Sequence, residues 1–166
     1  MRKELTRKLL SELLKDSKRS DRELAKVLGV SQPTITRKRN RPVAEGIIRE
    51  FTIIPDFAKM GYEIMAISCV KTKTPVTSEL AQDAAEWMKK FPNIIFVAGA
   101  EGFGKNGVMI SLHKNYTEYS KFVRAQVQHW KMNIQAYDSM LIGLKGTIAK
   151  PLSLSYLAEE KSEDQP

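Results

Sequence analysis

The first quarter of the chain repeats apolar positions with the period of an α-helix. Leucines recur at this spacing between residues 5 and 14, and polar residues 16–19 interrupt them, so we predict a helix over residues 4–15. Ser20 and Glu23 have the spacing of a capping box, in which each side chain satisfies a backbone N–H of the other residue. A second helix is predicted to begin there. Its expected buried face consists of Leu24, Val27 and Leu28.

A tight turn separates this helix from a third. Gly29 tolerates the positive φ that such a turn needs. Ser31 stands where it can cap the third helix, and Pro33 fits the first turn, where a missing N–H costs little. Ile35 is the expected inward anchor. The pattern therefore predicts helix, turn, helix.

A proline marks the predicted end of the third helix near Asn40. Pro42 lacks a backbone donor and disfavours the helical conformation at the residue before it. Residues 51–54 then have the apolar character of an extended connector. We place the domain boundary between residues 49 and 60.

From Tyr62 onward the pattern changes to apolar strands separated by amphipathic helices. The first helix has an apolar face from Leu80 to Phe91, and the second has a stripe that includes Phe122 and Val127. The order β-α-β-β-α-β is that of a ferredoxin-like unit, whose two helices cover one sheet face. The other face is apolar and uncovered in a monomer, so we expect self-association. The predicted strands are residues 64–70, 94–98, 108–112 and 134–144.

Charge divides the chain in the same way. The formal net charge is +8, and residues 1–50 carry +7 of it. A length of 166 residues suits two small domains, and 42% apolar with 28% charged residues is the balance of a globular protein. A basic block joined to a nearly neutral one indicates a polyanion-binding module fused to a part with another role.

The basic residues lie where a helix-turn-helix would present them to DNA, because its second helix enters the major groove. Gln32, Thr34 and Arg37 are candidates for base edges, since amide and guanidinium groups pair bidentately with adenine and guanine. The cations that follow are candidates for phosphate. The alternative is a helical hairpin with a solvated basic face. The full predicted DNA-binding set is Gln32, Thr34, Thr36, Arg37, Lys38, Arg39 and Arg41.

The remaining residues do not assemble into a catalytic or metal site. Cys69 is the single cysteine and is expected to be a small buried hydrophobe; His113 and His129 are expected at a surface or domain boundary. The G-x-G-x-x-G match at residues 102–107 runs into a strand, which indicates a hairpin and no dinucleotide site. We expect no enzyme activity, cofactor or metal. Without a membrane-spanning run or signal peptide, a cytoplasmic, nucleoid-associated protein is expected.

These features resemble the Lrp/AsnC family of prokaryotic transcription regulators. The likeness is carried by residues 9–13, residues 20–31 and Glu45-Gly46-Ile47-Ile48, followed by the β-α-β-β-α-β pattern. The resemblance implies an α+β protein that binds double-stranded DNA, dimerises through its sheet, often assembles to octamers, and responds to an amino acid. The implied parts are a winged-helix-like helix-turn-helix domain (1–50), a linker strand (51–60), a ferredoxin-like effector and oligomerisation (RAM) domain (61–150), and a C-terminal extension with a disordered end (151–166).

Two departures from the family bear on function. Arg39 and Pro42 stand where the family keeps apolar residues, which predicts a shorter recognition helix and leaves an alternative: a small-molecule sensor with a vestigial DNA-binding domain. The family loop Gly-Asp-Tyr-Asp, which helps to form the effector pocket, is replaced here by residues 99–106. This loop is either a modified effector site, with Glu101 as its carboxylate, or a plain glycine-rich hairpin. The effector candidates are Gly99, Glu101, Gly102 and Gly104.

Overall fold

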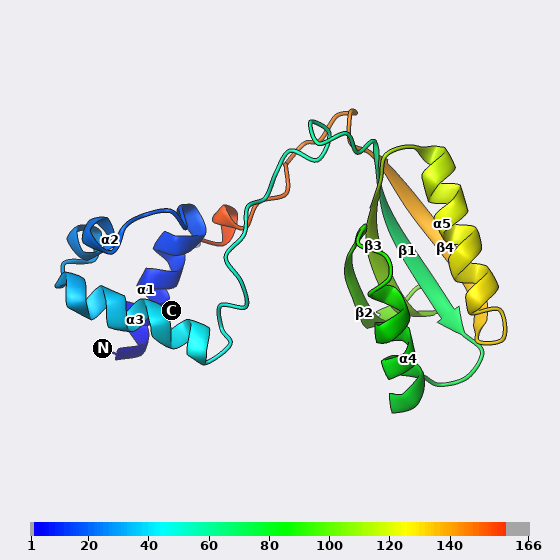
Figure 1. Ribbon diagram of the computed structural model, residues 1–166, viewed down its shortest axis with the longest axis horizontal. Helices are drawn as coiled ribbons and strands as arrows, with labels where there is room; N and C mark the ends of the chain where they lie inside the picture. Colours follow the sequence, from blue (N-terminus) through cyan, green and yellow to red (C-terminus); the bar gives the residue numbers. More distant parts are fainter. Residues whose placement is uncertain (1, 159–166) are drawn as a thin grey trace, which may run out of the picture. The chain divides into compact units, whose positions relative to one another are not determined.

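The computed structural model describes residues 2–158, and these residues form two compact units (Figure 1). The first unit contains residues 2–54 together with residues 150–158, and the second contains residues 55–149. The chain therefore crosses between the units twice. The end of the C-terminal extension, which we predicted to be disordered, lies outside the described residues.

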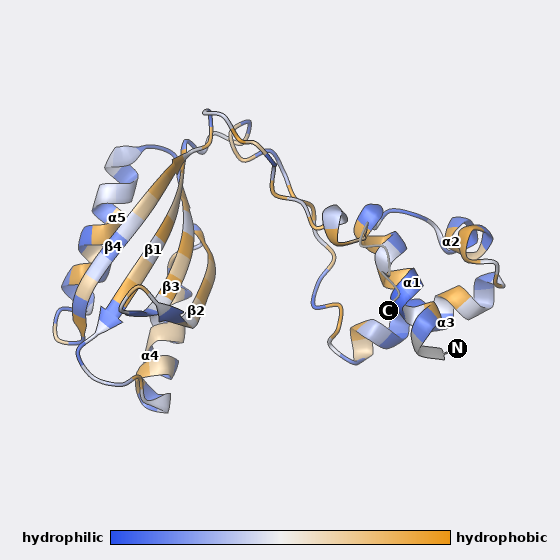
Figure 2. Ribbon diagram, turned by 180° about the vertical axis from the view of Figure 1, so that it is seen from behind, coloured by the Kyte–Doolittle hydropathy of each residue, from blue (hydrophilic) through white to orange (hydrophobic). Residues whose placement is uncertain are grey.

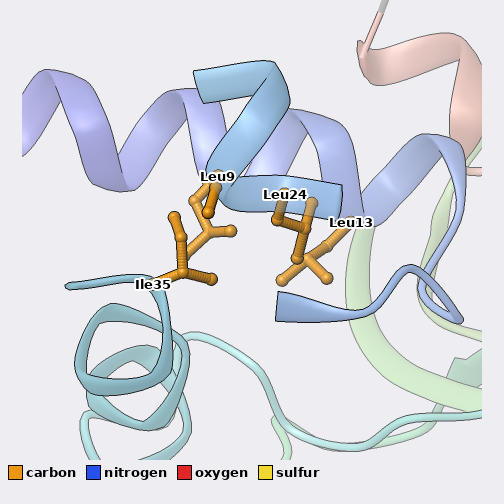
Figure 3. Close-up of a cluster of buried hydrophobic side chains, with 5 residues drawn as sticks. Leu9, Leu13, Leu24 and Ile35 are labelled. Atoms are coloured by element: carbon orange, nitrogen blue, oxygen red, sulfur yellow. The ribbon is translucent and has the colours of Figure 1, made fainter. Parts of the chain in front are cut away.

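The first unit consists of three helices around a small leucine-rich core. The helices are α1 (Arg2–Lys15), α2 (Asp21–Leu28) and α3 (Gln32–Ala44). Figure 3 shows the side chains of α1, α2 and α3 meeting at this core. Residues 2–54 contain no strand, so the wing that our winged-helix-like expectation included is not there. The core side chains are Leu9, Leu13, Leu24, Ala25 and Ile35.

The ends of α2 follow the predicted chemistry. The Ser20 side chain accepts from the Glu23 backbone N–H, and the Glu23 carboxylate accepts from that of Ser20, which confirms the capping box. Gly29 closes the helix with φ of 66°, in the left-handed region that favours glycine. The predicted buried face was wrong at Val27, which is 57% exposed. Ala25 takes the inward position, since its small side chain allows close helix contact.

The third helix is longer than predicted and includes the proline expected to lie beyond its end. Helix α3 continues to Ala44, and Pro42 is fully buried within its last turn. A proline there removes only one hydrogen bond near the helix end, and burial of its ring offsets that loss. The predicted linker strand over residues 51–60 was also wrong. Residues 51–56 have no regular structure, and residues 57–61 form a turn.

The C-terminal segment completes the first unit. A 3₁₀ helix, η1 (Ser155–Ala158), packs against α1, and the Ser11 hydroxyl donates to the carbonyl of Ala158 at 3.1 Å. Residues almost 150 positions apart in the sequence are therefore joined in one small unit.

The second unit is the predicted β-α-β-β-α-β fold. Its strands are β1 (Ile64–Thr72), β2 (Ile94–Gly102), β3 (Lys105–His113) and β4 (Ile134–Gly143), and its helices are α4 (Ser78–Met88) and α5 (Tyr116–His129). All strand pairs are antiparallel, in the order β2-β3-β1-β4. The side chains of Thr77 and Asn115 cap the two helices. None of the helices in the described chain combines the length and apolar composition needed to cross a membrane.

The two faces of the sheet differ. One face packs under α4 and α5 and buries Ala66, Ser68, Met109 and Ser111. The buried side chain of α5 beside Phe122 is Gln126, whereas Val127, predicted for this stripe, is 40% exposed. Strand alternation places an apolar set on the opposite face, and Figure 2 shows hydrophobic residues along the strands. This set, here called the open face, is Met65, Ile67, Cys69, Phe96, Val108, Ile110, Leu112, Met140 and Ile142.

The two histidines and the cysteine of the chain lie in three different environments. His113 was wrongly expected at a surface: it is buried, and its Nε2 lies 2.9 Å from the Ser111 hydroxyl. His129 is exposed and stacks on the Trp87 ring. Cys69 is half-buried on the open face, not fully buried as predicted.

Candidate nucleic-acid interface

The exposed side of α3 forms an open hollow at the surface of the first unit. Gln32, Pro33, Thr36, Arg37 and Asn40 line it, following one another at helical spacing. Ile35 points to the opposite side of the helix and is fully buried in the leucine-rich core. The core thus fixes the rotation of α3 and leaves one polar, basic side facing outward.

Arg37 is available to an outside partner. Its side chain is exposed, and among the described residues it makes no ion pair or hydrogen bond. Gln32, five positions before it on the same helix, is also exposed. The two side chains can reach an external surface without first breaking a bond within the protein.

Arg39 holds the unit together from within. Its guanidinium donates to the Asp21 carboxylate at 3.1 Å and to the carbonyls of Arg19 and Ser17 at 3.1 and 3.0 Å. It also lies over the Phe51 ring, 5.6 Å from the centroid. These bonds do not fit the predicted phosphate contact of Arg39, and we leave it out of the interface.

Asp21 joins α2 to α3 through two partners. The Thr36 hydroxyl donates to its carboxylate at 2.6 Å, and Arg39 donates to the other oxygen. The Thr36 hydrogen bond, and after it the Arg39 guanidinium, holds the pKa of the Asp21 carboxyl below its ordinary value. Thr36 therefore lines the hollow with its hydroxyl already engaged. Sequence spacing gave no sign of this bond, because it joins residues 15 positions apart.

The other predicted contact residues lie on or beside this surface. Arg41 is exposed and pairs with Glu45 at 2.6 Å, an i,i+4 surface pair worth only a few tenths of a kcal/mol, which phosphate can replace. Lys38 is half-buried. The hydroxyls of Thr34 and Ser31 lie 2.9 Å apart, and Ser31 makes no side-chain bond to the helix backbone, contrary to the predicted cap.

Sequence reasoning missed two members of the hollow. Asn40 was considered only as the end of the helix, and Pro33 only as a residue of its first turn. Their spacing from Thr36 and Arg37 is a signal that could have found them, since positions three and four apart share a helix face.

The predicted effector residues lie on the β2–β3 hairpin of the second unit. Gly99 and Gly102 belong to β2, and Gly104 follows Phe103 in a two-residue turn. The Glu101 side chain is exposed. The hairpin prediction for the G-x-G-x-x-G segment is confirmed.

Comparison with known proteins identifies the first unit. Residues 4–41 match the AsnC-type helix-turn-helix domain. The chain is 31% identical over 121 residues to the HTH-type transcriptional regulator FL11 of Pyrococcus horikoshii, covering 72% of this chain and 76% of that regulator. It is also 36% identical over 106 residues to the regulator PH0061 of the same organism, covering 63% of this chain and 65% of the relative.

Solved structures show the same fold over nearly the whole chain. The crystal structure of PH0061 superposes with a TM-score of 0.75 and 26% identity, covering 90% of this chain and 95% of that chain. The regulator NMB0573 of Neisseria meningitidis, solved as a complex with L-Met, has a TM-score of 0.72 and 16% identity, covering 92% and 97%. With its helix-turn-helix match and its relatives, this chain belongs to the Lrp/AsnC family, whose members are helix-turn-helix transcription regulators and not enzymes.

Proposed function

We propose that this chain is a sequence-specific transcription regulator that lays the exposed side of α3 in the major groove of double-stranded DNA. The observation that carries the proposal is the hollow lined by Gln32, Thr36 and Arg37, with Ile35 fixing the helix from behind. The charge of the first 50 residues supports it, because attraction to phosphate supplies most non-specific affinity. Association with the nucleoid follows from such binding.

The contacts divide into two kinds. Gln32 and Arg37 are the proposed readers of base edges, since their side chains pair bidentately with adenine and guanine respectively. Lys38 and Arg41 are the proposed phosphate contacts, which position the protein without reading sequence. Thr34 and Thr36 stay in the proposed set as shorter polar contacts beside them.

Arg37→Ala and Arg41→Ala, measured against a selected operator and a scrambled duplex, test this division. Arg37→Ala should cost about 1–3 kcal/mol on the operator and relax base preference. Arg41→Ala should weaken binding to both duplexes equally. It should also reduce the salt dependence of the affinity by the amount expected for about one lost phosphate contact. Equal losses on both duplexes from Arg37→Ala would contradict the assignment of base reading.

We propose further that the protein works as a dimer joined through the open face, with additional assembly to an octamer. A two-fold dimer would bind half-sites about 34 Å apart, or a multiple of that spacing. The second unit would then serve oligomerisation and effector binding, and the first unit DNA binding.

An amino acid is the proposed effector, held near the β2–β3 hairpin. The side chain of Glu101 would supply the carboxylate of the effector site. The support is structural likeness to the Neisseria regulator solved with L-Met. A thermal shift with free L-Met tests it: at 100 times the dissociation constant a ligand stabilises by about 2.7 kcal/mol. The alternative of a sensor with a vestigial DNA-binding domain rested on Arg39 and Pro42. It is less favoured, because α3 continues through Pro42 and leaves Arg37 exposed.

A further inference from the structure

The second unit contains a cavity of about 140 Å³ between α4, α5 and the covered face of the sheet. Figure 1 shows both helices alongside this sheet. Apolar side chains such as Val76, Leu80 and Met88 form most of the wall, and none of the lining residues in the described chain is charged. Strands β2 and β3 contribute to the wall, but Glu101, near the tip of their hairpin, does not line the cavity.

Three hydrogen-bond donors of residues that line this cavity have no partner among the described residues. They are Nε2 of Gln126, Nε1 of Trp130 and the hydroxyl of Tyr137. The amide of Gln126 is 1% exposed, and its orientation is set by Trp87, whose Nε1 donates to Oε1 at 3.0 Å. That bond assigns the carbonyl side of the amide to Trp87 and leaves the N–H side without a partner.

Buried donors without acceptors are rare, because each costs about 1–3 kcal/mol when unsatisfied. Three such donors around one cavity therefore indicate that an acceptor occupies it when the protein functions. The volume sets the size of that occupant, since a cavity of about 150 Å³ holds a benzene ring. The absence of charged residues among the described residues that line the cavity sets the chemical class of the occupant. A zwitterionic amino acid would bury an ammonium group with no carboxylate to pair it, which is strongly unfavourable.

We propose that this cavity binds a small neutral molecule with a mainly apolar body and one carbonyl or hydroxyl oxygen, which accepts hydrogen bonds from Gln126 and Trp130. Such a ligand is chemically distinct from an amino-acid effector. The site lies within the second unit alone, so the inference goes beyond the proposed DNA binding and does not depend on it.

The indole N–H signals of the full chain report directly on this site. The chain has two tryptophans, so a nitrogen–proton correlation spectrum contains two indole signals, which Trp130→Phe assigns. Titration with cyclohexanone should move the Trp130 signal downfield and saturate, as the indole gains an acceptor. The Trp87 signal should move less, because its bond to Gln126 remains. Benzene, which lacks an acceptor oxygen, should bind more weakly.

A pair of alanine variants on α4 locates the binding. Ala84 lines the cavity, so Ala84→Leu should fill it and weaken cyclohexanone binding about tenfold or more. Ala81 is exposed on the same helix, and Ala81→Leu should leave binding unchanged.

Three results would overturn the proposal. The first is that no probe moves the Trp130 signal of the wild-type chain, which would assign the cavity to water. The second is that L-leucine moves the signal as cyclohexanone does, which would refute the neutral class. The third is that Ala84→Leu leaves the cyclohexanone response intact, which would place the binding elsewhere.

Discussion

The side chain of Arg39 shows how one residue can decide between a structural and a DNA-binding role. Its ion pair with Asp21 leaves the two side chains only 24% and 21% exposed, and two backbone carbonyls complete the set of acceptors. A partly shielded guanidinium with three acceptors contributes more to the stability of the fold than a surface ion pair such as Arg41–Glu45 does. The sequence could not assign this role, because the partners lie 18 to 22 positions away.

Arg39→Ala should therefore lower the free energy of unfolding of the helical unit by about 1–2 kcal/mol. Both tryptophans lie in the second unit, so urea unfolding followed by helical circular dichroism should shift while tryptophan fluorescence stays constant. Arg41→Ala, at the exposed pair, should change stability by less than about 0.5 kcal/mol. Equal changes in unfolding free energy for the two variants would show that the Arg39 bonds stabilise the helical unit no more than the exposed Arg41–Glu45 pair does.

A second residue-scale prediction concerns acid stability. His113 is 2% exposed and packs against Tyr119 and Phe122. Burial lowers the pKa of the His113 imidazole from its ordinary value near 6.5, and the charge of Glu118 opposes this only in part. The unfolded chain takes up a proton near pH 6.5, whereas the folded chain does so only at lower pH. Stability is therefore full above about pH 6.5 and falls as the pH decreases below it.

The fluorescence-detected urea midpoint should accordingly fall between pH 7 and pH 5 in the wild-type chain. His113→Gln, which removes the titrating group, should flatten this dependence even if it lowers stability at pH 7. The same slope in both proteins would assign the pH dependence to other groups.

At the scale of the element, the β2–β3 hairpin carries local strain. Phe103 and Gly104 form its two-residue turn with φ of 50° and 68°, so both need the left-handed region, and Phe103 is fully exposed. A side chain other than glycine costs about 1–2 kcal/mol there, whereas asparagine tolerates it and Asn-Gly favours this turn.

Phe103→Asn should raise the stability of the second unit by about 1 kcal/mol. Phe103→Ala is the control: it removes the ring but keeps the strain, and should not stabilise. The urea midpoint of tryptophan fluorescence measures both. A loss of stability in the asparagine variant would instead mean that the phenylalanine ring packs against another copy of the chain.

Sequence reasoning succeeded where the signal was local. The capping box at Ser20 and Glu23, the left-handed Gly29 and the glycine hairpin follow from residues within a few positions of each other. It failed where packing decides. Pro42 stays helical because its ring is buried, and Val27 and Val127 are exposed although their spacing fits an apolar face.

At the scale of the whole molecule, the same distinction explains what was missed. The apolar runs of the strands, and their order with the helices along the chain, predicted the sheet and its open face. Nothing in the last residues indicated that residues 155–158 pack on α1 as part of the helical unit. The sequence alone was enough to place the proposed DNA-binding surface on the third helix. It could not show which residues of that helix make the contacts, because this depends on which basic side chains already bond to other groups of the protein.

The open face leads to the last prediction. Met140 lies on edge strand β4 opposite Ile67, is 68% exposed and points away from the helices, since its neighbour Ser139 bonds to buried Ser68 on the covered face. Burying such a surface against a second copy contributes about 25 cal/mol for each Å² of apolar area. A carboxylate there would have to be buried without a partner, which is costly. Met140→Asp should therefore shift the protein from dimer to monomer in sedimentation experiments.

Met132→Asp is the matched control, because Met132 is 79% exposed in the turn between α5 and β4. It makes the same chemical change outside the open face and should leave the dimer intact. Met140→Asp should also lose affinity for a two-half-site operator while keeping its weak affinity for a single half-site, because each monomer retains its own α3. A Met140→Asp protein that sediments as the wild type does would exclude the open face as the dimer interface. It would leave the base-reading role of Arg37 untouched, since that role depends on the helical unit alone.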